Sequence, residues 1–95
     1  MTEFMGMIWG KYDAKKGFAP GGASLHSCMT AHGPDRDTFV KASEGTDDPV
    51  FFGEGLAFMF ETNHMLAISE WALDSGDRDL DYHNCWVGLP KADKL

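Results

Sequence analysis

The strongest constraint on the fold of this chain is a run of side chains that alternates along LAFMFE. Leu56, Phe58 and Phe60 occupy every second position, which is the period of a β-strand and not of a helix. Residues 62–64 (TNH) suit a turn, and residues 65–73 then return as a second apolar run. The pattern predicts a β-hairpin built from these two strands.

The other predicted elements are short and separated by turn residues. They are a strand over 3–12, turn chemistry over 13–22, a strand over 23–29, a break at Gly33-Pro34, a helix over 35–44, a polar loop over 74–81 and a short packed turn around Trp86. Asp35 or Asp37 can cap the helix and Gly45 can end it. We predict a mainly β chain with one or two short helices, forming part of a β-sandwich or jelly roll.

The apolar content is high for so short a chain. Hydrophobic residues make up 43% of the 95 residues, with three Trp and seven Phe. A domain of this size buries a modest fraction of its unfolded surface. We therefore expect a single domain over residues 1–95, part of whose apolar surface packs against another chain or further sequence.

Charge and motifs exclude several classes of partner. The net charge of -7 disfavours binding to nucleic acid or to an anionic membrane, which both require clustered basic residues. No run has the length of a membrane span, and the first residues lack the pattern of a signal peptide. Cys28 and Cys85 are too few for a disulfide framework and suit reduced thiols. These features predict a cytoplasmic protein.

His26 and His32 are the first candidates for chemistry. Six residues on a continuous strand span about 20 Å, too far for both histidines to reach one ion. Either the chain bends between them, as Gly33-Pro34 just beyond His32 suggests, or the two have different roles. The alternative is that both are hydrogen-bonded structural histidines, which the spacing alone favours.

Glu3 and Tyr12 lie at the two ends of the first predicted strand. A carboxylate there is either solvated or placed for function, and Tyr12 is either an ordinary strand-end aromatic or a hydroxyl aimed into a pocket. His64, in the predicted turn, is expected to face solvent. His83, beside Tyr82, is expected to pack.

Three segments of the sequence resemble the homogentisate 1,2-dioxygenase family. The longest is residues 3–43, which contains PGGASLHSCMTAHGPD, and the others are LAFMFETNHMLAISEWAL and YHNCW. The resemblance implies a cupin-like jelly roll that assembles into trimers and hexamers. It also implies cleavage of homogentisate with O2 to maleylacetoacetate, in tyrosine and phenylalanine breakdown.

The resemblance also implies roles for single residues. Glu3 and His32 match iron-binding positions, and His32 additionally lies where substrate binds. Tyr12 matches a substrate-binding tyrosine, and His26 matches a catalytic histidine that lines the active site. Two histidines and one carboxylate on one face are the ligands of many non-haem Fe(II) oxygenases, so the implied cofactor is Fe(II).

Two family features have no counterpart here. The family's first iron-binding histidine precedes the glutamate by six residues, whereas Glu3 is the third residue of this sequence. The family's acid/base histidine also lies upstream. We therefore expect a C-terminal fragment of the ring-cleaving enzyme, inactive alone. The alternative is a non-catalytic β module that self-associates as a homodimer or larger oligomer.

Overall fold

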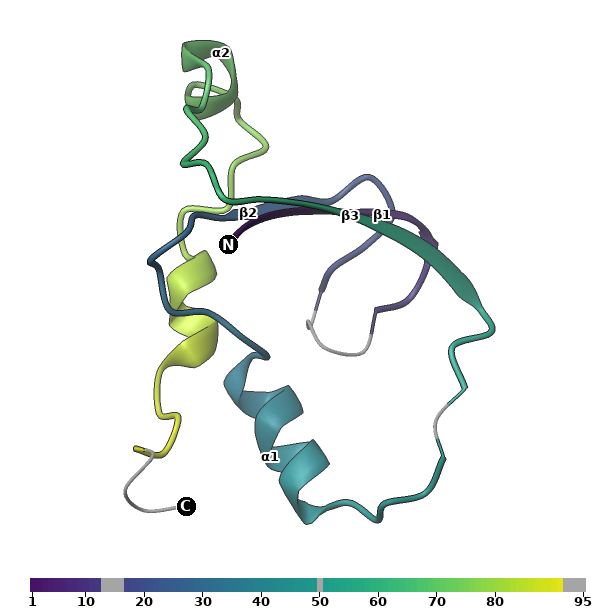
Figure 1. The fold of residues 1–95 in the computed structure, drawn as a ribbon. Coiled ribbons are helices and arrows are strands. Elements are labelled where there is room, and N and C mark those ends of the chain that lie inside the picture. Colours follow the sequence, from purple (N-terminus) through teal and green to yellow (C-terminus); the bar gives the residue numbers. More distant parts are fainter. Residues whose placement is uncertain (13–16, 50, 92–95) are drawn as a thin grey trace.

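The computed structural model describes residues 1–12, 17–49 and 51–91 and contains one antiparallel sheet with short helices (Figure 1). Its elements are β1 (Thr2–Gly10), β2 (Ala23–His26), α1 (Arg36–Glu44), β3 (Gly55–Thr62), α2 (Glu70–Leu73) and the 3-10 helix η1 (Tyr82–Trp86). The strand order is β2-β1-β3. The predicted mainly β class is confirmed, and the sheet is consistent with part of a cupin-like jelly roll.

The register of the sheet separates its two faces. Glu3 lies opposite His26 on β2 and opposite Glu61 on β3. Met5 pairs with Met59 on β3. Because side chains alternate between faces along a strand, these residues share one face. In Figure 1 this face is turned toward α1 and η1, and α2 lies on the opposite side of the sheet.

The opposite face is aromatic. Phe4 pairs with Phe60 across β1 and β3, and Gly6 pairs with Phe58. The Phe58 ring lies 5.9 Å from the ring of Phe4 and 5.5 Å from that of Phe60, measured between centroids. A Cβ atom at Gly6 would lie 2.4 Å from the Phe58 ring. Glycine at this position therefore makes room for the aromatic side chain opposite it.

The strands β1 and β2 both end earlier than the predicted strands over 3–12 and 23–29. β1 ends at Gly10, where φ is +84° and a Cβ atom would lie 2.2 Å from the carbonyl oxygen of Glu54. Tyr12 therefore lies beyond the strand and not at its end. β2 ends at His26 because a turn follows, in which Thr30 N–H donates to the carbonyl of Ser27 (3.2 Å). The predicted turn over 13–22 lies partly outside the described residues.

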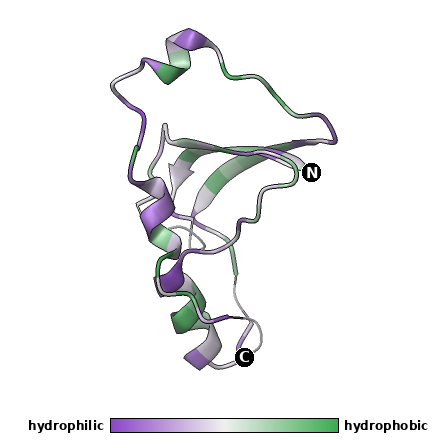
Figure 2. Ribbon diagram, turned by 90° about the vertical axis from the view of Figure 1, so that its left-hand side faces the viewer, coloured by the Kyte–Doolittle hydropathy of each residue, from purple (hydrophilic) through white to green (hydrophobic). Residues whose placement is uncertain are grey.

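The predicted hairpin over residues 56–73 is wrong in its second half. β3 is present, but its partner is β1. Residues 65–69 form no strand, and Ser69 caps α2 by accepting from Ala72 N–H (3.3 Å). The apolar run after His64 leaves the sheet, although the outer edge of β3 is open in the described part of the chain, and its segment projects away from the strands (Figures 1 and 2).

The helical predictions hold. Asp35 is the N-cap of α1, where its carboxylate accepts from Thr38 N–H (2.7 Å), and Gly45 follows the last helical residue. The predicted packed turn is η1, which contacts α1. Among the described residues, no helix is long and apolar enough to cross a membrane.

The chain leaves much of its surface uncovered. It exposes 7856 Å², whereas a compact monomer of this length exposes roughly 5,400 Å². Met5 and Met7 are the buried hydrophobic side chains among the described residues, whereas Phe60 is 68% exposed. Figure 2 shows hydrophobic residues along the strands. A contiguous apolar face of this kind favours association with a partner.

Replacing Gly6 by alanine tests the close approach of Phe58. The added methyl group must displace the aromatic ring, and overpacking of this kind costs about 1–3 kcal/mol of unfolding free energy. Gly76→Ala is the control, because a Cβ atom there meets nothing within 4 Å. We expect a lower midpoint of urea unfolding for Gly6→Ala than for Gly76→Ala. Equal midpoints would contradict the packing.

Self-association is the second prediction. The apolar side chains of β1 and β3 predict an interface at or beside Phe58, Phe60, Met7 or Trp9, and of these Met7 is buried within the chain. Light scattering of the purified chain at micromolar concentration should report a dimer or larger species. Phe60→Glu should shift it toward monomer, while Phe51→Glu, at a 92% exposed position outside the sheet, should not. A monomeric wild-type chain would contradict this prediction.

Candidate metal centre

The centre of the site is a contact between Glu3 on β1 and His32 in the loop that follows β2. Glu3 Oε2 and His32 Nε2 are 2.8 Å apart, and both side chains are partly exposed. The turn over 27–30 reverses the chain after β2 and brings His32 back under the sheet. The chain therefore does bend between the two histidines, at residues 27–30 and not at Gly33-Pro34.

The second nitrogen of His32 determines which tautomer is present. His32 Nδ1 lies 3.0 Å from the backbone carbonyl of Thr30. A carbonyl oxygen can only accept, so Nδ1 carries the hydrogen. Nε2 then faces Glu3 either as a second N–H donor of an imidazolium or, in the neutral ring, as a lone pair that shares a cation with the carboxylate. Backbone carbonyls orient metal-binding histidines in the same way.

His26 lies beside this pair on the neighbouring strand. Its cross-strand partner is Glu3, it is 7% exposed, and its ring stacks on that of His32 with centroids 4.4 Å apart and planes 8° apart. Its Nε2 lies 2.9 Å from the hydroxyl of Tyr82 in η1. His26 is thus held between the loop that carries His32 and the C-terminal 3-10 helix.

The distances place Glu3, His26 and His32 together, with one ligand atom from each within 4.8 Å of the others. The ring orientations separate their roles. An imidazole nitrogen binds an ion that lies in its own ring plane, and a point in the plane of one stacked ring lies outside the plane of the other. His26 and His32 therefore cannot both bind one ion while they are stacked.

Glu3 and His32 fit as two ligands of one divalent ion. Two donor atoms at right angles on an octahedral ion, each about 2.1 Å from it, are roughly 3 Å apart, close to the 2.8 Å observed. A carboxylate and an imidazole also supply two of the three ligands of the non-haem iron facial triad. The chemistry and the spacing of this pair suit ferrous iron.

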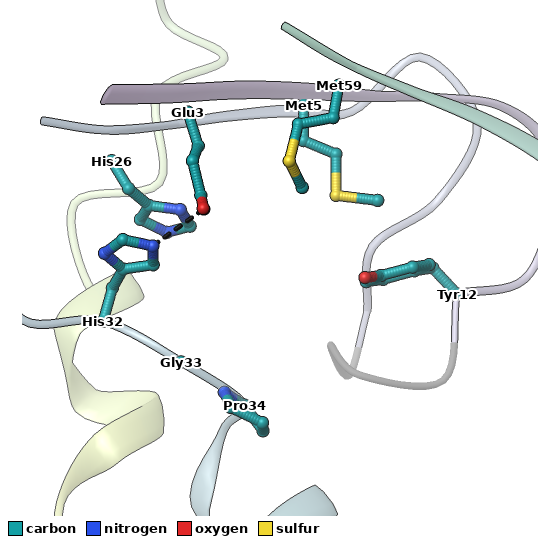
Figure 3. A pocket seen from close by; sticks show the side chains of 8 residues that line it. All are labelled: Glu3, Met5, Tyr12, His26, His32, Gly33, Pro34 and Met59. Atoms are coloured by element: carbon teal, nitrogen blue, oxygen red, sulfur yellow. Dashed lines mark hydrogen bonds and ion pairs between the residues drawn. The ribbon is translucent and has the colours of Figure 1, made fainter. Parts of the chain in front are cut away.

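A pocket of about 260 Å³ opens beside the pair, and Figure 3 shows the side chains that line it. Met5 and Met59 form an apolar wall on the sheet. Tyr12 lies across the pocket with its hydroxyl directed into it (Figure 3), and its ring packs edge-on against Phe18. Thioether groups pack well against aromatic rings, so Met5 and Met59 offer a surface on which an aromatic ring can pack.

The structure also reveals residues whose contribution was not predicted from the sequence. Tyr82 contacts His26, and Trp86 Nε1–H donates to the carbonyl of Gly33 (3.0 Å). The motif YHNCW predicted a packed turn, but nothing local in it indicates that the turn meets both histidine segments. His64 is exposed, as predicted, whereas His83 is exposed and does not pack.

The surroundings of Tyr82, which contacts His26, alter its acidity. Burial, followed by the nearby charges of Cys85, Asp35 and Asp79, raises the pKa of Tyr82 above its ordinary value. All of these influences disfavour the phenolate. Tyr82 therefore keeps its hydroxyl proton and remains able to donate a hydrogen bond to His26.

The fold and the site define a mainly β protein with a candidate carboxylate–histidine metal centre. Residues 1–93 match the family described as homogentisate 1,2-dioxygenase C-terminal. The homogentisate 1,2-dioxygenase of Oryza sativa subsp. japonica is 54% identical over 92 residues, which cover 94% of this chain and 20% of that protein. The chain belongs to the homogentisate 1,2-dioxygenase family and spans about a fifth of the length of this relative.

Proposed function

We propose that this chain forms the C-terminal part of a ring-cleaving dioxygenase that converts homogentisate and O2 to maleylacetoacetate, and that Glu3 and His32 contribute two ligands to its ferrous iron. The observation that carries the proposal is the 2.8 Å approach of the Glu3 carboxylate to His32 Nε2 beside a pocket. Family membership supports the choice of substrate.

The iron, when bound, supplies the redox chemistry that allows O2 to react with an aromatic ring. The protein residues have separate tasks. His32 keeps its Nδ1 hydrogen on Thr30 and presents Nε2 to the ion, and Glu3 supplies a negative charge that partly neutralises it. His32 also borders the space that the substrate enters.

Tyr12 and His26 act on the substrate in this proposal. The Tyr12 hydroxyl, directed into the pocket (Figure 3), donates a hydrogen bond to a polar substituent of the ring. His26 lies next to His32 but outside its ring plane, where it assists as a catalytic proton donor or acceptor. Met5 and Met59 pack against the substrate ring and exclude water.

The complete enzyme requires more than these residues. A facial triad has three protein ligands, and among the described residues the fitting pair is Glu3 and His32. Another ligand would come from other sequence or another subunit, and the exposed aromatic face of the sheet would be covered in the same assembly. We also propose that residues 1–95 form one structural unit and that it is cytosolic, since two cysteines are too few for a disulfide framework.

A second candidate function is a non-catalytic β module that self-associates. The observation that favours it is the large exposed apolar surface, which includes Phe60. Such a module would use Glu3 and His32 as a surface ion pair without iron. The metal content of the purified chain distinguishes the two functions.

The 95-residue chain alone should not cleave homogentisate. Two protein ligands hold iron less firmly than three, and we expect oxygen uptake with homogentisate and added Fe(II) to equal the protein-free background. An oxygen electrode measures this directly. Uptake above background that disappears in His32→Asn would mean that this chain by itself forms the active centre.

Binding of Fe(II) tests the ligand assignment without requiring activity. Under anaerobic conditions the wild-type chain should bind Fe(II) in isothermal titration calorimetry, and Glu3→Gln or His32→Asn should each weaken binding by about tenfold or more. His83→Gln is the matched control, because it removes an exposed imidazole outside the pocket. Equal affinities for all four proteins would overturn the assignment.

A further inference from the structure

We infer that Tyr82 is a positioning residue: its hydroxyl donates to His26 Nε2, fixes the ring hydrogen of His26 on Nδ1, and keeps His26 out of the coordination sphere of an ion held by Glu3 and His32. The inference extends the proposed function, because it assigns a role to the C-terminal 3-10 helix. It depends on the proposed function only where it concerns the ion.

The contacts of Tyr82 fix the His26 ring in position and in orientation. The Tyr82 hydroxyl lies 2.9 Å from His26 Nε2, and the two rings lie 5.9 Å apart with their planes 28° apart. His32 stacks on the same imidazole, with a smaller angle of 8° between the planes. A rotation of His26 about its Cβ–Cγ bond would break both the hydrogen bond and the stack.

Trp86 holds Tyr82 in place from the next turn of η1. The Trp86 ring meets the Tyr82 ring edge-on, with centroids 5.0 Å apart and planes 73° apart. Its indole N–H donates to the carbonyl of Gly33, the residue that follows His32. One short helix therefore contacts His26 through a phenol and the His32 loop through an indole, which couples the positions of the two histidines.

The direction of the hydrogen bond follows from the two partners. A neutral phenol is a stronger acid than the N–H of a neutral imidazole, and an imidazole lone pair is a stronger base than a phenol oxygen, so O–H···N is the favoured arrangement. Because the pKa of Tyr82 is raised, the phenol is neutral and carries the hydrogen that this bond requires. His26 Nε2 accepts, and in the neutral ring Nδ1 then carries the hydrogen.

This arrangement explains how two histidines with adjacent rings can differ in function. When an ion is bound, the Nε2 lone pair of His32 is directed at it beside Glu3, because the Nδ1 hydrogen is committed to the carbonyl of Thr30. The lone pair of His26 is committed to Tyr82. One imidazole can therefore bind the ion, while the lone pair of the other is engaged by Tyr82.

The test is the tautomer of His26 in the 95-residue chain. Long-range 1H–15N correlation spectra of the neutral histidines distinguish a protonated ring nitrogen from one with a lone pair. In the wild-type chain we expect Nδ1–H for His26. In Tyr82→Phe the ratio of Nδ1–H to Nε2–H should fall by roughly three- to tenfold, as expected for the loss of one hydrogen bond.

His83→Gln serves as the control in the same helix and should leave the His26 signals unchanged. Circular dichroism verifies that Tyr82→Phe remains folded. If this variant unfolds, the wild-type spectrum still decides the question, because His26 with its hydrogen on Nε2 would overturn the inference. An unchanged tautomer ratio in folded Tyr82→Phe would overturn it as well.

Titration with Co(II) separates this inference from the proposed function. His26→Asn should bind Co(II) with an affinity within about threefold of wild type, while His32→Asn should bind at least about tenfold more weakly. If the two variants lose affinity equally, His26 is a ligand and the inference fails, although a metal site remains. If the wild-type chain binds no Co(II), the metal site fails, and the tautomer measurement still decides the role of Tyr82.

Discussion

The pairing of β1 with a strand on each side is the constraint on which the rest of the structure depends. Because β1 is central, Glu3 has His26 on one side and Glu61 on the other. The same alternation puts Met5 on the face of Glu3 and puts Phe4 on the opposite face. A shift of one residue in register would exchange the faces and move the carboxylate away from the histidines. The site is therefore a consequence of register.

Sheet register places Glu3 and His26, but it does not place His32. The position of His32 depends on the turn after β2, in which Met29 has φ of +67°. It also depends on two polar contacts of the His32 ring. The Thr30 carbonyl accepts from the His32 ring, and Glu3 meets the opposite nitrogen. With Met5 and Met7 as the buried hydrophobic residues of the described chain, these directional contacts position the loop more than a packed core does.

Local signals were predictable from the sequence, and pairings between distant segments were not. The alternation around Phe58 identified β3, and the acidic residues before the helix identified its start, although only the structure selects Asp35 over Asp37 as the cap. The partner of β3 was predicted wrongly, because a period of two reports that a strand exists and says nothing about its neighbour. The motif match indicated Glu3 and His32, which the fold brings together.

The role of Tyr82 belongs to the class of features that no local pattern can reveal. Residues 26 and 82 are far apart in sequence, and a tyrosine in a short polar turn suggests only packing. Yet the tautomer of a histidine is set by the partner of its ring nitrogen, so this contact determines whether the imidazole can act as a ligand. Two histidines stacked in parallel would otherwise present equivalent lone pairs near one carboxylate. The different partners, a backbone carbonyl for one and a phenol for the other, make them chemically distinct.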